Sequence, residues 1–315
     1  MKIVFFGSSH FAVPALEALI NSDYEICCVV TQPDKKKGRH LHLAGTDVKT
    51  LAEKSGLCIF QPKDINTPES VKLISKFSPD LFVIVAYGQI LTQEVLDIPK
   101  IFPINIHASL LPKYRGAAPI NWSIIRGDKS TGVTIMKVTR KMDSGPIIIQ
   151  QEFPIQENED SVVLEDKLRK IGSKLLMEAL EQIRGKSLNL KEQDEKKVVF
   201  APKLKKADGY IDWSRSPNEI YNLVRGTVPW PGAVTYFKNK LLKVYKSKSV
   251  QEIRLEKKVF FGEVLEVNKD EIIVACGRGA LAIDELQLEG GTKMIAKDFI
   301  HGHKVKVGDS FGKSS

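Results

Sequence analysis

Two polar side chains, Asn105 and His107, lie at the end of a short apolar stretch, and Asp143 follows 36 residues after the histidine. The period-two alternation of a β-strand places Asn105 and His107 on one face of a sheet. An asparagine amide can donate to a developing oxyanion, a histidine can move a proton near neutral pH, and a nearby aspartate can fix the imidazole and favour its charged form. This set suits transfer of a formyl group to an amine, which passes through a tetrahedral intermediate and needs no Ser or Cys nucleophile.

Each of these residues also has an ordinary structural explanation. A single histidine at a strand end is more often a satisfied buried residue, a single asparagine often caps or turns the chain, and Asp-Ser-Gly at 143–145 is a common turn sequence. The combination carries more information than its members. It is strengthened by the loop that follows His107, in which Pro112 and Pro119 restrict the backbone and Gly116 permits a tight turn, so that the loop can hold one shape.

The first half of the chain alternates apolar strands with helices. Strands are predicted at 3–6, 25–31, 57–60, 81–86, up to His107, and at 147–154, with helices at 12–21, 47–54, 68–77, 92–96 and 161–184. This alternation predicts an α/β fold with a doubly wound, mostly parallel sheet, a Rossmann-like domain whose ligand crevice lies at the carboxyl ends of the strands. The turn after the first strand lacks the full Gly-x-Gly-x-x-Gly pattern, so NAD binding is not expected.

The second part of the chain has a different pattern. Six of the seven residues at 191–197 are charged, which indicates a solvated linker. Beyond it, short strands are predicted at 233–237, 241–245, 263–267, 271–276 and 281–288, separated by turn sequences. We therefore expect a catalytic domain at 1–189, a linker at 190–206 and a small OB-like β-barrel at 207–315.

The charge of the chain is moderately basic and unevenly distributed. The net charge is +9, and residues 203–315 hold 20 Lys and Arg against 14 Asp and Glu, a net of +6. Small barrels often bind nucleic acid, and a basic one favours a polyanionic partner. No Cys-x-x-Cys pair is present, and His301 and His303 have no further ligand nearby in sequence, so no metal site is expected. We also expect a cytoplasmic protein that does not enter a membrane.

The sequence Asn105-Ile-His107-Ala-Ser-Leu-Leu-Pro-Lys-Tyr-Arg-Gly, with Met-Asp143-Ser-Gly-Pro downstream, resembles the signature of the 10-formyltetrahydrofolate-dependent formyltransferase family. The resemblance implies that Asn105, His107 and Asp143 are the catalytic residues. It implies that the tetrahydrofolate group is bound by the segment Ser109, Leu110, Leu111 and Pro112. The formyl donor would then be 10-formyltetrahydrofolate, with no metal.

Over its whole length the chain is most similar to the family members that formylate the α-amino group of methionyl initiator tRNA for translation initiation. Arg225-Gly-Thr-Val-Pro-Trp-Pro-Gly-Ala is one of several stretches typical of these members. The resemblance implies a basic loop after the second strand that reaches the tRNA, and further contacts from the second domain. The residues so implicated are Lys35, Lys36, Lys37, Arg39, Lys205 and Lys206.

Two features depart from the usual pattern. The loop continues after Arg39 as His-Leu-His-Leu-Ala-Gly rather than a proline-rich basic stretch, and the opening turn is Gly-Ser-Ser rather than Gly-Thr-Pro. Three alternatives stay open: a formyltransferase for an amino-sugar nucleotide, a formyltetrahydrofolate hydrolase, and a non-enzymatic RNA-binding protein on the same scaffold. The basic loop and the basic second domain favour tRNA over a small acceptor. A monomer is expected.

Overall fold

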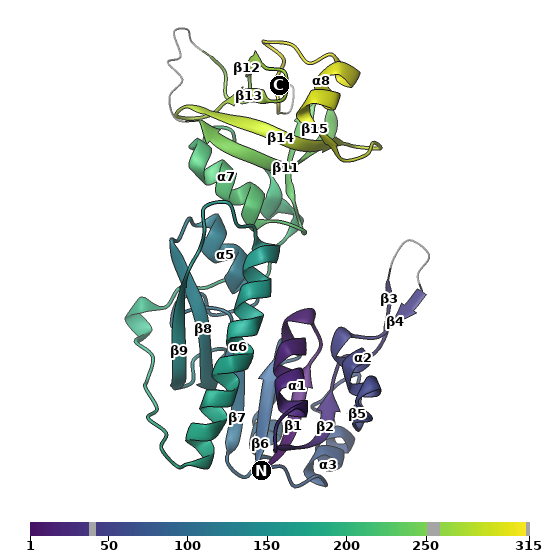
Figure 1. The fold of residues 1–315 in the computed structure, drawn as a ribbon, viewed down its shortest axis with the longest axis vertical. Helices are drawn as coiled ribbons and strands as arrows, with labels where there is room; N and C mark the ends of the chain where they lie inside the picture. The colour runs from purple at the N-terminus through teal and green to yellow at the C-terminus, as the bar shows by residue number, and fades with distance from the viewer. Residues whose placement is uncertain (38–41, 251–258, 313–315) are drawn as a thin grey trace. The chain divides into compact units, whose positions relative to one another are not determined.

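The computed structural model describes residues 1–37, 42–250 and 259–312, and the chain divides into two compact units (Figure 1). Unit 1 comprises Met1–Pro119, Ser130–Pro154 and Glu165–Pro202, and unit 2 comprises Ile120–Lys129, Ile155–Leu164 and Lys203–Ser315. Within the described residues, no helix combines the length and the apolar character needed to cross a bilayer.

The secondary structure alternates in the first half and is rich in strands in the second. The strands are β1 Lys2–Gly7, β2 Glu25–Val30, β3 Lys35–Lys37, β4 His42–Ala44, β5 Ile59–Phe60, β6 Leu81–Val85, β7 Phe102–His107, β8 Ser130–Lys137, β9 Ile147–Pro154, β10 Ala233–Phe237, β11 Lys240–Val250, β12 Val264–Val267, β13 Ile272–Ala275, β14 Ala280–Leu288 and β15 Met294–Ile295. The helices are α1 Val13–Ile20, α2 Asp47–Lys54, α3 Pro68–Ser75, α4 Gln93–Leu96, α5 Pro119–Ile125, α6 Ser161–Arg184, α7 Pro217–Gly226 and α8 Ala296–His303, with short 3-10 turns at His10–Ala12, Glu195–Lys197 and Lys206–Gly209.

Unit 1 is built on a seven-stranded sheet of order β5-β2-β1-β6-β7-β8-β9. The first five strands in this order run parallel, β8 pairs antiparallel with β7, and β9 pairs antiparallel with β8. The predicted doubly wound, mostly parallel sheet is confirmed. Strand β8 was not among the predicted strands.

The central strands of this sheet are buried on both faces. All residues of β1 after Lys2 are buried, and β6 is nearly so, which is why these strands read as continuous apolar runs. On one face, Gly172 of α6 lies against Ile106 and Val133, where a larger residue would meet the Ile106 side chain. Because side chains alternate along β7, Asn105 and His107 project from the face opposite to Ile106.

Unit 2 contains an antiparallel sheet of order β10-β11-β14-β13-β12, with β15 paired to β14. Its core includes Phe237, Phe299 and Phe311, all fully or almost fully buried. Helix α7 begins with a capping box, in which Ser216 accepts from the Glu219 amide and the Glu219 carboxylate accepts from the Ser216 amide. The predicted antiparallel β-domain is present. The ladders among the described residues run in an open order, so closure into an OB-like barrel stays a prediction.

His301 and His303, which were not expected to bind a metal, lie in the last turn of α8. His301 is exposed, and its Nδ1 is 2.7 Å from the carbonyl oxygen of Lys297. In the parts of the chain that are described, no three His, Cys, Asp or Glu side chains come together as a metal ion would require.

Candidate active site

His107 ends β7, the strand at which the sheet changes from parallel to antiparallel pairing. Strand β7 pairs in parallel with β6 on one side and antiparallel with β8 on the other, where His107 lies opposite Thr134. Open α/β sheets bind their ligands outside the carboxyl ends of their strands, and His107 is at such an end. His107 is only 6% exposed, so its two ring nitrogens depend on partners within the protein.

The partners of the two His107 nitrogens differ in chemistry. Nε2 lies 2.8 Å from the carbonyl oxygen of Tyr114, which can only accept, so Nε2 carries a proton and donates it. Nδ1 lies 3.8 Å from Oδ2 of Asp143. Because Nε2 is held as a donor, Nδ1 is the nitrogen at which a proton can be gained and lost, and it does so beside a carboxylate.

Asp143 reaches the histidine from the loop between β8 and β9. Its backbone has a positive φ of 49°, and its Oδ2 accepts a hydrogen bond of 2.8 Å from the amide of Gly116. The same carboxylate oxygen therefore faces His107 and the loop that follows β7. This amide contact fixes where the negative charge lies relative to the imidazole.

Asn105 lies two residues before His107 and lines a cavity of about 220 Å³ within unit 1. The walls of the cavity also include Gln89, Leu91, Met136, Thr139 and Asp143. This volume is below the roughly 300–1,000 Å³ of sites for whole drug-sized ligands, so the cavity suits the reacting end of a larger molecule. The structure thus brings Asn105 and Asp143 to one cavity, and His107 to Asp143.

The segment Ser109–Pro112 is held tightly by its own hydrogen bonds and by the neighbouring strand. Thr134 of β8 donates to the carbonyl of Ser109 at 2.6 Å and accepts from the amide of Leu111 at 3.2 Å. Leu111 packs in a small apolar cluster with Met136, which is also a wall residue of the cavity. The segment therefore adjoins the cavity through Met136, with Leu110 and Pro112 partly exposed.

The basic residues proposed from the resemblance fall in both units. Lys35–Lys37 form β3, which pairs with β4, and the side chain of Lys35 is exposed. Arg39 lies outside the described residues. In unit 2, Lys205 and Lys206 are exposed at the start of a 3-10 turn, where the Lys205 amide donates to Asp208.

Sequence reasoning missed a contact that the structure places at the Asp143 loop. Gln193, within the charged stretch 191–197, donates from Nε2 to the carbonyl oxygens of Asp143 at 2.9 Å and Gly145 at 2.7 Å. The buried Arg115 donates to the other end of the same amide. Gln193 is the one uncharged residue at 191–197, and no sequence signal distinguishes it from its neighbours. Of its partners, only Arg115 belonged to the motif found in the sequence.

Comparison with known proteins adds family membership to this geometry. Residues 1–180 match the family model described as formyl transferase, and residues 203–304 match formyl transferase, C-terminal domain. In solved structures, the chain resembles an N-formyltransferase from Helicobacter canadensis, with a TM-score of 0.67 at 18% identity over 93% of this chain and 100% of that one. It also resembles HypX from Aquifex aeolicus in complex with tetrahydrofolic acid, with a TM-score of 0.62 at 18% identity over 100% of this chain and 51% of that one. These likenesses define the class, a formyl transferase with a second, C-terminal domain.

Curated relatives narrow the class. A methionyl-tRNA formyltransferase from Citrifermentans bemidjiense is 44% identical over 99% of this chain and 97% of its own length. A methionyl-tRNA formyltransferase from Acetivibrio thermocellus is 44% identical over 99% of this chain and 100% of its own length. The chain belongs to the methionyl-tRNA formyltransferase family.

Proposed function

We propose that the protein transfers the formyl group of 10-formyltetrahydrofolate to the α-amino group of methionyl initiator tRNA, giving N-formylmethionyl-tRNA for translation initiation. Family membership over the full length of both chains supports the reaction and the acceptor. The single structural observation that carries the chemistry is the position of His107 Nδ1, 3.8 Å from the Asp143 carboxylate. His107 lies two residues after Asn105 on the same strand. The proposed acceptor is a cytoplasmic RNA, so the proposal implies a cytoplasmic site of action.

In the proposed reaction, the α-amino nitrogen attacks the formyl carbon, and the carbonyl oxygen gains negative charge. The Asn105 amide donates to this oxygen, a contribution on the order of 3–4 kcal/mol for one such donor. His107 Nδ1 takes the proton from the attacking nitrogen and gives it to N10 of the folate as the C–N10 bond breaks. The Asp143 carboxylate attracts that proton while it resides on the imidazole, and the Tyr114 carbonyl keeps the ring oriented through Nε2.

The proposed donor site includes Ser109, Leu110, Leu111 and Pro112. Two features support it: the segment is held in one conformation by Thr134, and Leu111 contacts a residue of the cavity that Asn105 lines. A held segment loses little conformational entropy when a ligand binds. The reduced folate would place its formyl-bearing nitrogen toward the cavity.

The proposed tRNA contacts are Lys35, Lys36, Lys37 and Arg39 in unit 1 and Lys205 and Lys206 in unit 2. Lys35, Lys205 and Lys206 are exposed, as phosphate-binding side chains must be. Each phosphate contact releases condensed counterions, so the affinity for tRNA should fall with salt by a log–log slope of about −0.7 to −0.9 per contact. Arg39→Ala should raise the KM for tRNA and leave the KM for the folate unchanged.

The decisive experiment offers the purified full-length chain 10-formyltetrahydrofolate with charged initiator tRNA, uncharged tRNA, or a dTDP-linked amino sugar. Formyl-methionine formed on the charged tRNA alone supports the proposal. Formylation of the sugar, or release of formate at the same rate without any acceptor, would replace it with one of the alternatives. His107→Ala should lower kcat by about 10²–10⁴-fold. Asn105→Ala should lower kcat by about 10²–10³-fold. Near-wild-type turnover in either variant would refute the role given to that residue.

A further inference from the structure

A segment after α6, residues 191–201, runs along both loops that carry the proposed catalytic groups. We call it the strap. At its start, Lys191 and Ile147 exchange two backbone hydrogen bonds of 2.8 and 2.9 Å, next to the end of the Asp143 loop. Towards its other end, the amide of Arg115 donates to the carbonyl of Val199 at 2.9 Å. Residues 191–197 of the strap are mostly charged and mostly exposed, and the backbone of the strap is bonded to both loops.

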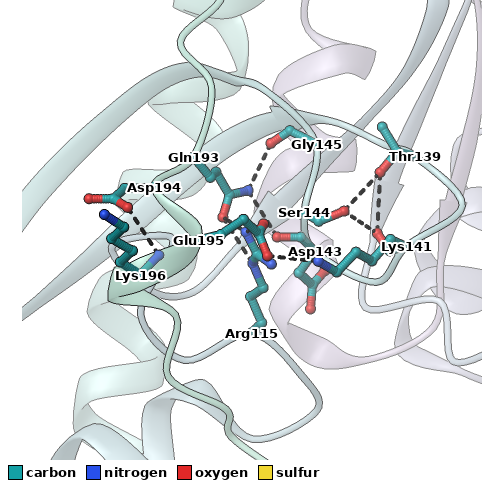
Figure 2. Close-up of polar contacts among 10 residues, drawn as sticks. All are labelled: Arg115, Thr139, Lys141, Asp143, Ser144, Gly145, Gln193, Asp194, Glu195 and Lys196. Atoms are coloured by element: carbon teal, nitrogen blue, oxygen red, sulfur yellow. Dashed lines mark hydrogen bonds and ion pairs between the residues drawn. The ribbon is translucent and has the colours of Figure 1, made fainter.

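Gln193 lies where the strap crosses the Asp143 loop, and its amide joins that loop to Arg115 (Figure 2). Its Nε2 donates to the carbonyl oxygens of Asp143 and Gly145. Its Oε1 accepts from Nε and Nη2 of Arg115 at 3.0 and 2.9 Å. A guanidinium can only donate and a carbonyl can only accept, so the orientation of this amide is determined by its partners.

Arg115 is held in turn by charge. Its side chain is 1% exposed, and Nη2 also donates to Oε1 of Glu195 at 2.8 Å, while Oε2 of Glu195 accepts from Lys141 at 2.7 Å. These two cations hold the pKa of Glu195 at about 2. The strap is thus tied to the loop after β7 through Arg115 and to the Asp143 loop through Lys141 and Gln193.

The backbone of the Asp143 loop adopts an uncommon conformation. Asp143 has φ of 49°, in the left-handed region that single aspartates adopt more readily than most non-glycine residues. Gln193 donates to the Asp143 and Gly145 carbonyls, which flank Ser144. These two hydrogen bonds stabilise the conformation that turns the Asp143 carboxylate toward His107. The loop is also held by the Gly116 amide at Oδ2 and by Ser144, whose hydroxyl donates to the Lys141 carbonyl at 2.8 Å. The Gln193 bonds differ from these because they hold the Asp143 and Gly145 carbonyls from outside the loop.

We propose that Gln193 is a positioning residue for the reaction: through its two hydrogen bonds to the Asp143 loop it sets the position of the Asp143 carboxylate against His107. The inference rests on the proposed function, because it assumes that Asp143 acts on His107 during formyl transfer. It assigns to the strap a part in catalysis beyond joining the two units in sequence. Gln193 itself touches neither reacting group, so it acts only through Asp143.

The test compares Gln193→Glu with Asp143→Asn, with the double variant, and with the matched neighbour Asp194→Asn in the full-length chain. Gln193→Glu keeps the size and an acceptor for Arg115 but replaces the donor to both carbonyls with an oxygen that repels them. Among the described residues, the Asp194 side chain has contacts within its own turn, at the Lys196 amide and near the Lys197 ammonium. Initial rates of methionyl-tRNA formylation are measured at varied donor and varied tRNA, with the melting temperature as a check on folding.

Gln193→Glu should lower kcat by about 10- to 100-fold, the scale of a displacement of about 1 Å at a reacting group, with both KM values within about twofold. In the Asp143→Asn background it should cause no further loss, since its effect passes through that carboxylate, and Asp194→Asn should keep wild-type rates. A purely structural role would lower the melting temperature and leave kcat of the folded enzyme within about twofold. Gln193→Met adds no charge and removes both the donor to the loop and the acceptor for Arg115, and it gives the second readout if the glutamate variant folds poorly.

The outcomes separate the inference from the proposal beneath it. If Asp143→Asn itself keeps wild-type turnover, the role of Asp143 in the proposed function fails. If Asp143→Asn loses turnover while Gln193→Glu and Gln193→Met do not, only the role of Gln193 is overturned. Losses that multiply in the double variant would also overturn it, because they would show that Gln193 acts independently of Asp143.

Discussion

Thr134→Val tests whether the segment after His107 is held in place by one buried hydroxyl. Thr134 lies opposite His107 in the β7–β8 pair and is fully buried. Its Oγ1 donates to the carbonyl of Ser109 at 2.6 Å and accepts from the Leu111 amide at 3.2 Å and from Gln150 at 2.7 Å. Valine has nearly the same shape, so the substitution removes the hydroxyl without opening a cavity.

The expected cost follows from the groups left without a partner. The Ser109 carbonyl and the Leu111 amide lose this hydroxyl within the protein interior. A buried polar group left unsatisfied costs about 1–3 kcal/mol, so the two together should lower the free energy of unfolding by roughly 2–6 kcal/mol. If the segment binds the folate, the KM for 10-formyltetrahydrofolate should rise several-fold, with the KM for tRNA unchanged.

The assay is urea unfolding of the full-length chain followed by circular dichroism, with Thr131→Val as the matched control. Thr131 is on the same strand and 3% exposed, but its Oγ1 is buried with no hydrogen-bond partner in the described parts of the chain. Replacing it should be neutral or stabilising by up to about 1 kcal/mol. All three tryptophans, Trp122, Trp213 and Trp230, lie in unit 2, so fluorescence reports separately on that unit.

Equal stability of Thr134→Val and Thr131→Val would refute the reasoning, because the two substitutions differ chiefly in the hydrogen bonds removed. A loss of stability with an unchanged KM for the donor would leave the structural role intact. It would count against Ser109–Pro112 as the folate-binding segment.

Two further predictions concern the supports of the Asp143 loop. An alanine side chain at Gly145 would overlap the backbone carbonyl of Lys137, so Gly145→Ala should destabilise the protein by roughly 1–3 kcal/mol or more and lower turnover. The control is Gly302→Ala in α8, where a methyl group meets open space, and this variant should be neutral or stabilising. Similar melting temperatures for the two variants would contradict this prediction. The pKa of Glu195 is lowered from an ordinary 4.5 to about 2 by Arg115 and Lys141, so its contribution to stability is present above about pH 4.5 and is lost as the pH falls toward 2. The stability difference between wild type and Glu195→Gln, measured by urea unfolding at several pH values, should therefore be constant near neutrality and shrink in that window; a difference that does not change with pH would show that the ion pairs do not stabilise the fold.

The sequence by itself predicted the elements whose signals are local. Helices at 47–54 and 161–184 and the strand at 233–237 have the predicted bounds, since caps and side-chain periodicity are properties of neighbouring residues. Strand β8 was missed, although most of its residues are buried, because its antiparallel place at β7 depends on pairing with a distant segment. Helix α7 was also missed, although its capping box and Pro217 were readable signals.

The proposed site divides in the same way. The placing of Asn105 and His107 on one face follows from the period of a strand, and this could be predicted from two positions in the sequence. The approach of Asp143 to Nδ1 and the choice of Nε2 as the fixed donor depend on loops that meet only when the sheet forms. Gln193 lies 50 residues from Asp143 in an exposed, charged stretch, where no periodicity or motif marks it. Only the tertiary structure decides its partners, because a hydrogen bond between distant segments requires both backbones to be in place.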